Sequence, residues 1–149
     1  MFMKPYLYLG FIVLLGSCLP KEKIEFRKVQ NIRFEMLSKS PGLKADLVLF
    51  NPNNTSGKLK NIKLDIFVND KKAGEMNQTF DQKINGKEEF TVPVEVSLAL
   101  KELGLFDALV NILGAKKQTV RLSGSVKVTV HGVPVSIPID HKEDMKVKL

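Results

Sequence analysis

The sequence is poor in cysteine, tryptophan and histidine, and each shortage excludes a class of function. Cys18 is the only cysteine in 149 residues, so the region after it can form no internal disulfide and has no cysteine for catalysis. Tryptophan is absent and the lysines are not interleaved with aromatic residues, which argues against a groove for single-stranded nucleic acid. No nucleophile-elbow pattern or phosphate-binding glycine loop is present. We therefore expect neither an enzyme nor a nucleic-acid-binding protein.

The two histidines offer little to a metal ion. His131 stands alone, whereas His141 lies near Asp140, Glu143 and Asp144. This spacing matches no recognised metal-binding motif and is typical of a solvated tail or loop. We expect no metal and no cofactor.

The apolar run at residues 6–15 is too short to cross a bilayer as a helix, which takes about 20 residues. It follows Lys4 and precedes Leu15-Gly16-Ser17-Cys18, the order of a secretory signal peptide. The four residues resemble the bacterial lipobox. The resemblance implies that signal peptidase II cuts between Ser17 and Cys18 and that the Cys18 thiol carries a diacylglyceryl group.

This pattern divides the chain into a signal peptide at 1–17, a lipidated cysteine with a short spacer at 18–23, and one domain at 24–149. Two or three acyl chains hold a protein stably on a membrane, so the lipid on Cys18 makes the membrane a partner. Because Leu19 rather than aspartate follows the cysteine, we expect the outer membrane in a Gram-negative host that uses that sorting rule.

Alternation of apolar and polar residues, the period of a half-buried strand, dominates the predicted domain. The side chains expected on the buried faces are Ile32, Phe34, Met36, Ala45, Leu47, Leu49, Ile62, Leu64, Ile66, Val68, Phe90, Val92, Val94, Val96, Val120, Leu122, Val126, Val128, Val130, Val133, Val135, Ile137 and Ile139. Pro134 and Pro138 cannot donate to a ladder and place the last strand at a sheet edge or in a bulged stretch. One apolar face per strand predicts two antiparallel sheets packed face to face.

Short turns and one helix complete the expected domain. Asn69-Asp70, Asn85-Gly86 and His131-Gly132 tolerate the positive φ of tight hairpins. Leucines with helical spacing at residues 97–114 predict an amphipathic helix, capped by Ser97 and ended by Gly114. The helix either packs on the sandwich or forms a lid over an apolar cavity.

Several segments together resemble a known family. They are Leu47-Val48-Leu49-Phe50-Asn51-Pro52-Asn53, an alternating strand with Gly74 downstream, Val92-Pro93-Val94, and Val120-Arg121-Leu122-Ser123-Gly124. The chain is similar over residues 24–139 to the late embryogenesis abundant type 2 domain, also called the water stress and hypersensitive response (WHy) domain. The resemblance implies an immunoglobulin-like or fibronectin-III-like β-sandwich of about seven strands, protection under desiccation or other stress, and no catalytic residues. Bacterial members of the family are often lipoproteins.

The Asn51-Pro52-Asn53 turn is the most recognisable part of the resemblance. Pro52 fixes φ near about −65°, and the flanking asparagines bond their own backbone and tolerate left-handed geometry. We interpret the motif as a strand-ending turn. The alternative is a polar recognition tip formed with Asn54, Thr55 and Ser56.

The net charge of +7 is the remaining pointer to a partner. Its lysines are scattered over several turns and strands: Lys58, Lys60, Lys63, Lys71, Lys72, Lys116, Lys117, Lys142, Lys146 and Lys148. They form either a solvated surface or one attracted to anionic lipid or polysaccharide of the envelope. Three functions stay open: a lipid-anchored stress-protection module contacting membranes or proteins, a β-sandwich that binds an apolar ligand or lipid, and a structural subunit of an envelope assembly. The sequence does not predict the oligomeric state.

Overall fold

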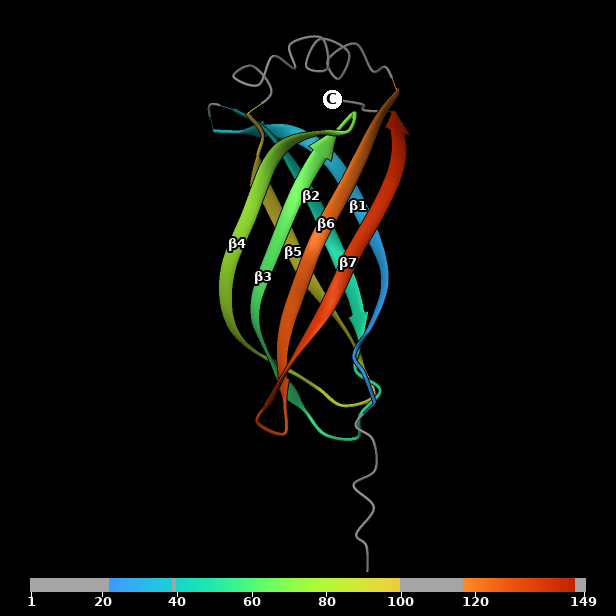
Figure 1. The fold of residues 1–149 in the computed structure, drawn as a ribbon, viewed down its shortest axis with the longest axis vertical. Helices are drawn as coiled ribbons and strands as arrows, with labels where there is room; N and C mark the ends of the chain where they lie inside the picture. The colour runs from blue at the N-terminus through green and yellow to red at the C-terminus, as the bar shows by residue number, and fades with distance from the viewer. Residues whose placement is uncertain (1–21, 39, 100–116, 147–149) are drawn as a thin grey trace, which may run out of the picture.

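Two antiparallel sheets pack face to face in the computed structural model, which describes residues 22–38, 40–99 and 117–146 (Figure 1). One sheet has the order β1-β2-β5 and the other the order β4-β3-β6-β7. The bounds are β1 Glu25–Leu37, β2 Ser40–Phe50, β3 Gly57–Val68, β4 Lys71–Ile84, β5 Glu89–Ser97, β6 Lys117–Val130 and β7 Val133–Lys146. The predicted all-β, immunoglobulin-like or fibronectin-III-like sandwich of about seven strands is confirmed.

The core lies between the sheets because each strand directs most of its apolar side chains toward the facing sheet. Leu43, Leu47 and Leu49 from β2 and Ile62 and Ile66 from β3 are fully buried. The predicted inward residues of β5 and β6 are also buried, except for the half-buried Phe90. Most of the helix predicted at 97–114, from residue 100 onward, lies outside the described residues. Ser97, its predicted cap, is the last residue of β5.

Two of the three predicted tight turns join neighbouring strands. Asn69 and Asp70 have φ of 50° and 65° between β3 and β4, and His131 and Gly132 have φ of 51° and 73° between β6 and β7. Positive φ at both central residues matches the right-handed twist of the flanking strands. The prediction for Asn85-Gly86 was wrong: this turn carries the chain from β4 in one sheet to β5 in the other.

The pattern predicted for β1 is correct only in part, and the strand contains an irregularity. The pairing with β2 shifts between Gln30 and Arg33, and Asn31 has a φ of 54°. A bulge inserts an extra residue, which reverses the alternation beyond it. Val29 and Phe34 are therefore both buried. The predicted burial of Met36 was wrong: it has the parity of Phe34 but lies beside the turn to β2 and is 62% exposed.

The last strand is an edge strand, as its prolines predict, and it is longer than the alternating segment. Pro134 and Pro138 are exposed, and so is Val133, although the alternation predicts its burial. The charged stretch after Ile139 is no loose tail, because it continues β7 and pairs with β6 as far as Lys146.

The sandwich has two ends, which we name after the asparagines found there. At the Asn51 end lie residue 22, the loop between β2 and β3, the β4–β5 crossover and the β6–β7 hairpin. At the Asn69 end lie the β1–β2 and β3–β4 turns and the C-terminus of β7 (Figure 1).

Candidate functional site

Asn51 is a fully buried polar residue at the end of the sandwich. Its side-chain amide nitrogen donates to the carbonyl oxygens of Thr55 at 3.0 Å and Asn85 at 2.9 Å. Its side-chain oxygen accepts from the backbone nitrogen of Asn53 at 3.1 Å and from the side-chain nitrogen of the same residue at 3.0 Å. The full hydrogen-bonding capacity of the amide is therefore used inside the protein.

The backbone around Asn51 ties the β2–β3 loop to the β4–β5 crossover. Its N–H donates to Glu88 O at 3.0 Å, while the N–H of Lys87 donates to Asn51 O at 2.8 Å and to Asn53 O at 3.0 Å. Gly86 allows this contact, because a Cβ there would lie 2.7 Å from Asn53 O. Lys87 takes the positive φ, 56°, that redirects the chain into β5.

The rest of the turn holds two further segments. Asn53 donates from its side chain to the carbonyl oxygen of Glu22 at 2.8 Å, which fixes the start of the described chain against the loop. The Thr55 hydroxyl lies 2.7 Å from Nε2 of His131 in the β6–β7 hairpin. Pro52 is buried between these contacts.

The structure thus separates the two interpretations of the motif by position. Asn51 and Pro52 are buried and Asn53 is half-buried, so these three residues are placed to hold loops together. Residues 54–56 are exposed and form the outer surface of the same loop. The predicted lipidation and cleavage residues, Cys18 and Ser17, lie outside the described residues.

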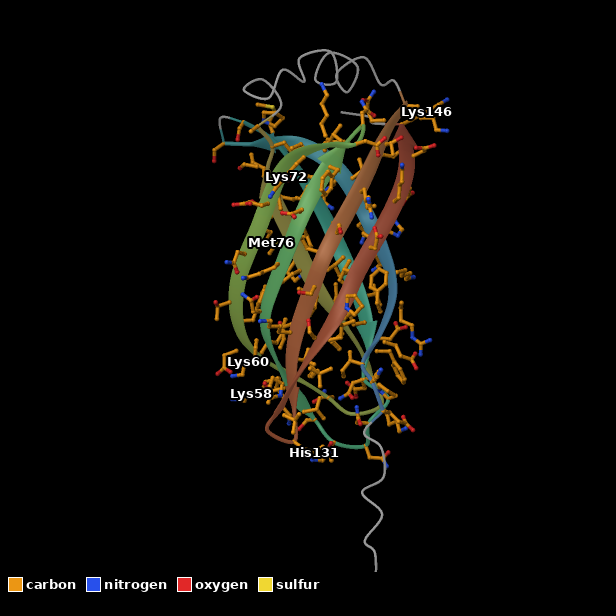
Figure 2. All side chains as sticks on the ribbon, viewed as in Figure 1. Lys58, Lys60, Lys72, Met76, His131 and Lys146 are labelled. Carbon is orange, nitrogen blue, oxygen red and sulfur yellow. The ribbon has the colours of Figure 1, made fainter. Side chains whose placement is uncertain are left out.

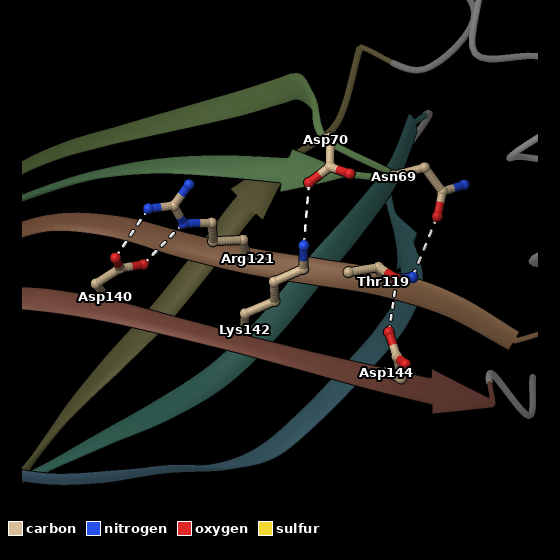
Figure 3. A network of polar contacts seen from close by, with 7 residues as sticks. All are labelled: Asn69, Asp70, Thr119, Arg121, Asp140, Lys142 and Asp144. Carbon is tan, nitrogen blue, oxygen red and sulfur yellow. Dashed lines mark hydrogen bonds and ion pairs between the residues drawn. The ribbon is translucent and has the colours of Figure 1, made fainter.

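A polar network covers the outer face of the four-stranded sheet at the Asn69 end (Figure 3). Arg121 donates to both carboxylate oxygens of Asp140 at 2.8 Å, and this bidentate contact holds the pKa of Asp140 below its usual value. The Thr119 hydroxyl donates to Asp144 at 2.6 Å, and this bond, followed by that from Lys117, lowers the pKa of Asp144. Both contacts favour the ionised form of Asp140 and Asp144.

The acidic residues around His141 do not converge. The alternation of β7 puts Asp140 and Asp144 on the outer face and His141 with Glu143 on the other, where His141 Nε2 is 3.2 Å from the Glu143 carboxylate. Within the described ranges, no three histidine, cysteine or acidic side chains are placed to hold a metal ion. No helix among the residues that the structure describes is long and apolar enough to cross a membrane.

The family model for late embryogenesis abundant protein, LEA_2, matches residues 46–143. The chain belongs to this family. The match begins within β2, later than the resemblance at residue 24 predicts, and it includes the whole Asn51 turn. No curated protein shows significant sequence similarity to the chain.

Solved structures share the fold of this LEA_2 domain. A solution structure of an Arabidopsis thaliana protein aligns with a TM-score of 0.69 at 14% identity, over 90% of this chain and 89% of that one. A crystal structure of an Archaeoglobus fulgidus protein aligns with a TM-score of 0.60 at 12% identity, over 84% of this chain and 99% of that one. At such low identities these likenesses show a common fold.

Sequence reasoning found the LEA_2 turn but not its partners. Asn85, Gly86 and Glu22 complete the arrangement, and the first two were predicted to form a hairpin. The turn signal at Asn85-Gly86 was correct, but nothing in the local pattern indicates that it crosses between sheets to meet Asn51.

Proposed function

We propose that the protein is a lipid-anchored, non-enzymatic protein of the bacterial cell envelope whose LEA_2 domain protects membranes or proteins under stress such as drying. The observation that carries the proposal is the family match over residues 46–143. The side-chain amide of Asn51 makes all its hydrogen bonds inside the protein, so it has no donor or acceptor left for a ligand. This favours a role through contacts of the exposed surface.

The described hydrogen bonds give little support to catalysis. Thr55 and His131 form a hydroxyl–imidazole pair at an exposed site. A nucleophile and base also need a third group that orients the base. No hydrogen bond among the described residues joins His131 to a carboxylate, so we assign the pair to loop packing.

The lipid anchor is supported by the order of Lys4, the apolar run and Leu15-Gly16-Ser17-Cys18. Cells fed a labelled fatty acid should mark the wild-type protein and leave a Cys18→Ala variant unmarked. The variant should also move from the membrane fraction to the soluble fraction. Label that persists on the variant would remove the anchor from the proposal.

The protective role is tested on a drying-sensitive enzyme. Residues 19–149 contain every strand of the sandwich, and the test compares this unlipidated domain with an equal mass of an unrelated β-sandwich protein. After drying and rehydration, we expect more enzyme activity with the LEA_2 domain than with the control. Equal recovery would contradict stress protection.

The alternatives of an apolar-ligand carrier and an envelope-assembly subunit gain no support from the described residues. The inward side chains of both sheets pack into one buried cluster. The grooves beside Gly124 and beside His131 open on the outer surface and include polar or charged side chains.

A further inference from the structure

The two ends of the four-stranded sheet differ in how their lysines are neutralised. At the Asn69 end, Lys72 lies 2.8 Å from Asp65, Lys117 lies 3.2 Å from Asp144, and Lys142 lies 3.3 Å from Asp70. Each of these three lysines has its own carboxylate partner, whereas Lys71 and Lys146, at the same end, have none within ion-pair distance among the described residues.

At the Asn51 end, Lys58 and Lys60, which lie close together near the end of the sandwich in Figure 2, share a single carboxylate. Lys58 and Lys60 lie 3.4 Å and 2.8 Å from the same oxygen of Asp81. Among the residues that the structure describes, Lys83 has no acidic side chain within ion-pair distance. Lys83 was not among the lysines singled out from the sequence, and the pairing of β3 with β4 brings it opposite Lys58.

These lysines line an open groove of about 580 Å³ that we call the basic groove, defined by Lys58, Lys60, Lys83, Thr129, His131 and Gly132. No carboxylate is among its described lining residues. The threonine hydroxyl and the lysine ammonium groups can all donate hydrogen bonds. The groove therefore has the charge and the donors to receive an anion.

The pairing of β3 with β4 places like charges next to each other, which strand pairs usually avoid. Lys58 is directly opposite Lys83 in the β3–β4 register, an arrangement of like charges that destabilises a sheet. Lys60 follows Lys58 by two residues and so lies on the same face of β3, where both reach Asp81. Violations of local rules are expected where a surface has a function.

The position of the basic groove relative to the proposed anchor identifies the anion. Glu22 is the fourth residue after Cys18, which limits the distance between them to about 14 Å at full extension. Glu22 is bonded to Asn53, and Thr55 of the same loop is bonded to His131 of the groove. The anchored domain therefore holds the groove close to the lipid headgroups.

We propose that the basic groove binds the phosphate groups of anionic phospholipids and orients the anchored domain with its Asn51 end on the membrane. This inference rests on the proposed lipid anchor. Lysines close to an anionic surface each contribute about 1 kcal/mol, a factor of about five in binding. The attraction falls off within about 8 Å at physiological salt, so only the end next to the membrane contributes.

The test uses the unlipidated domain, residues 19–149, so that binding does not depend on the anchor. Co-sedimentation is measured with phosphatidylcholine vesicles that contain or lack phosphatidylglycerol, at low and physiological salt. We expect binding that needs phosphatidylglycerol and weakens with salt. The triple variant Lys58→Gln, Lys60→Gln, Lys83→Gln should bind at least about tenfold more weakly.

A matched triple variant at the other end separates the groove from net charge. Lys72→Gln, Lys117→Gln, Lys142→Gln removes the same number of charges from the Asn69 end and should bind within about twofold of the wild type. Thermal melting checks that both variants fold. Equal weakening of both, or no binding by the wild type, would overturn the inference.

Three further results distinguish this inference from the proposed stress protection and the proposed lipid anchor. Displacement from vesicles by low concentrations of inorganic phosphate would show a site for free phosphate and overturn the membrane assignment. Drying protection by a domain that fails to bind vesicles would leave the proposed function intact and reject the groove. Vesicle binding together with fatty-acid label on Cys18→Ala would keep the groove and reject the anchor.

Discussion

Replacing Asn51 by aspartate tests whether the family turn holds the Asn51 end together. The substitution keeps the volume and one oxygen for Asn53, but it exchanges the donor nitrogen for an oxygen facing the carbonyl oxygens of Thr55 and Asn85 at 3.0 and 2.9 Å. Burial and these two carbonyls disfavour an ionised carboxylate, so the pKa of the new carboxyl group should rise well above its unfolded value.

The magnitude follows from the two protonation states. A protonated carboxyl group can donate to only one of the two carbonyls, so it loses one hydrogen bond, about 1 kcal/mol. Holding it protonated at pH 7 costs up to about 4 kcal/mol, since the unfolded pKa lies about three units lower. We expect a loss of about 3–5 kcal/mol in the free energy of unfolding at pH 7, or about 10–15 °C in melting temperature.

The pH dependence has a definite sign. Because the folded pKa is raised, the variant keeps its stability below the unfolded pKa near about 4 and loses it as the pH rises through the folded value. The gap between Asn51→Asp and wild type, measured by thermal melting, should therefore narrow to about 1 kcal/mol in acid. Asn54→Asp, on the exposed surface of the same loop, is the matched control. A stability difference between variant and wild type that does not change with pH, or an equal loss of stability in Asn54→Asp, would refute the reasoning.

Two other predictions concern the four-stranded sheet. Gly124→Ala should lower the free energy of unfolding by about 2 kcal/mol in urea titrations, because the added Cβ would fall on the carbonyl oxygen of Lys63 in the adjacent strand; wild-type stability would contradict the close approach. Arg121→Gln removes the bidentate partner of Asp140, whose lowered pKa gives stability above about pH 4 that is lost as the pH falls. The variant should melt a few degrees below wild type at pH 7 and converge with it in acid, and a constant difference would reject the assignment.

The strands that the sequence predicts well are those with one uninterrupted apolar face. Ile62, Leu64 and Ile66 alternate with polar residues along the central strand β3, and burial of one face is the physical reason for that period. The order of residues along the strand carries this information, because burial on one face selects the residue type at every second position.

Strands at the edges are harder to predict because bulges and charge hide the period. In β4, the buried residues Ala73, Met76 and Ile84 do not share one parity, and the pairing with β3 shifts twice. In β7, the charged segment after Ile139 is held by pairing with β6 and by contacts such as Asp140 with Arg121. Such stabilisation comes from a neighbouring strand and leaves no local pattern.

The turn at Asn51 shows the same limit for the candidate site. Asparagine and proline predict a turn correctly, but turns are usually solvated. The burial of Asn51 depends on Asn85, which is 34 residues away and arrives only because β4 and β5 belong to different sheets. Sequence reasoning therefore found the motif and could not find what the motif binds.

The buried residues of the family turn hold loops together and are not available to a partner. Binding to a partner therefore depends on exposed residues of the outer surface. The chain carries a net charge of +7, and the carboxylate partners of Lys72, Lys117 and Lys142 cancel much of the positive charge at the Asn69 end. The basic groove lies at the same end of the sandwich as the predicted anchor, so the proposed lipid and the proposed electrostatic attraction would draw the same end toward the membrane. A tether keeps the groove at a high effective concentration near the headgroups, and weak binding by the groove is then sufficient to set the orientation.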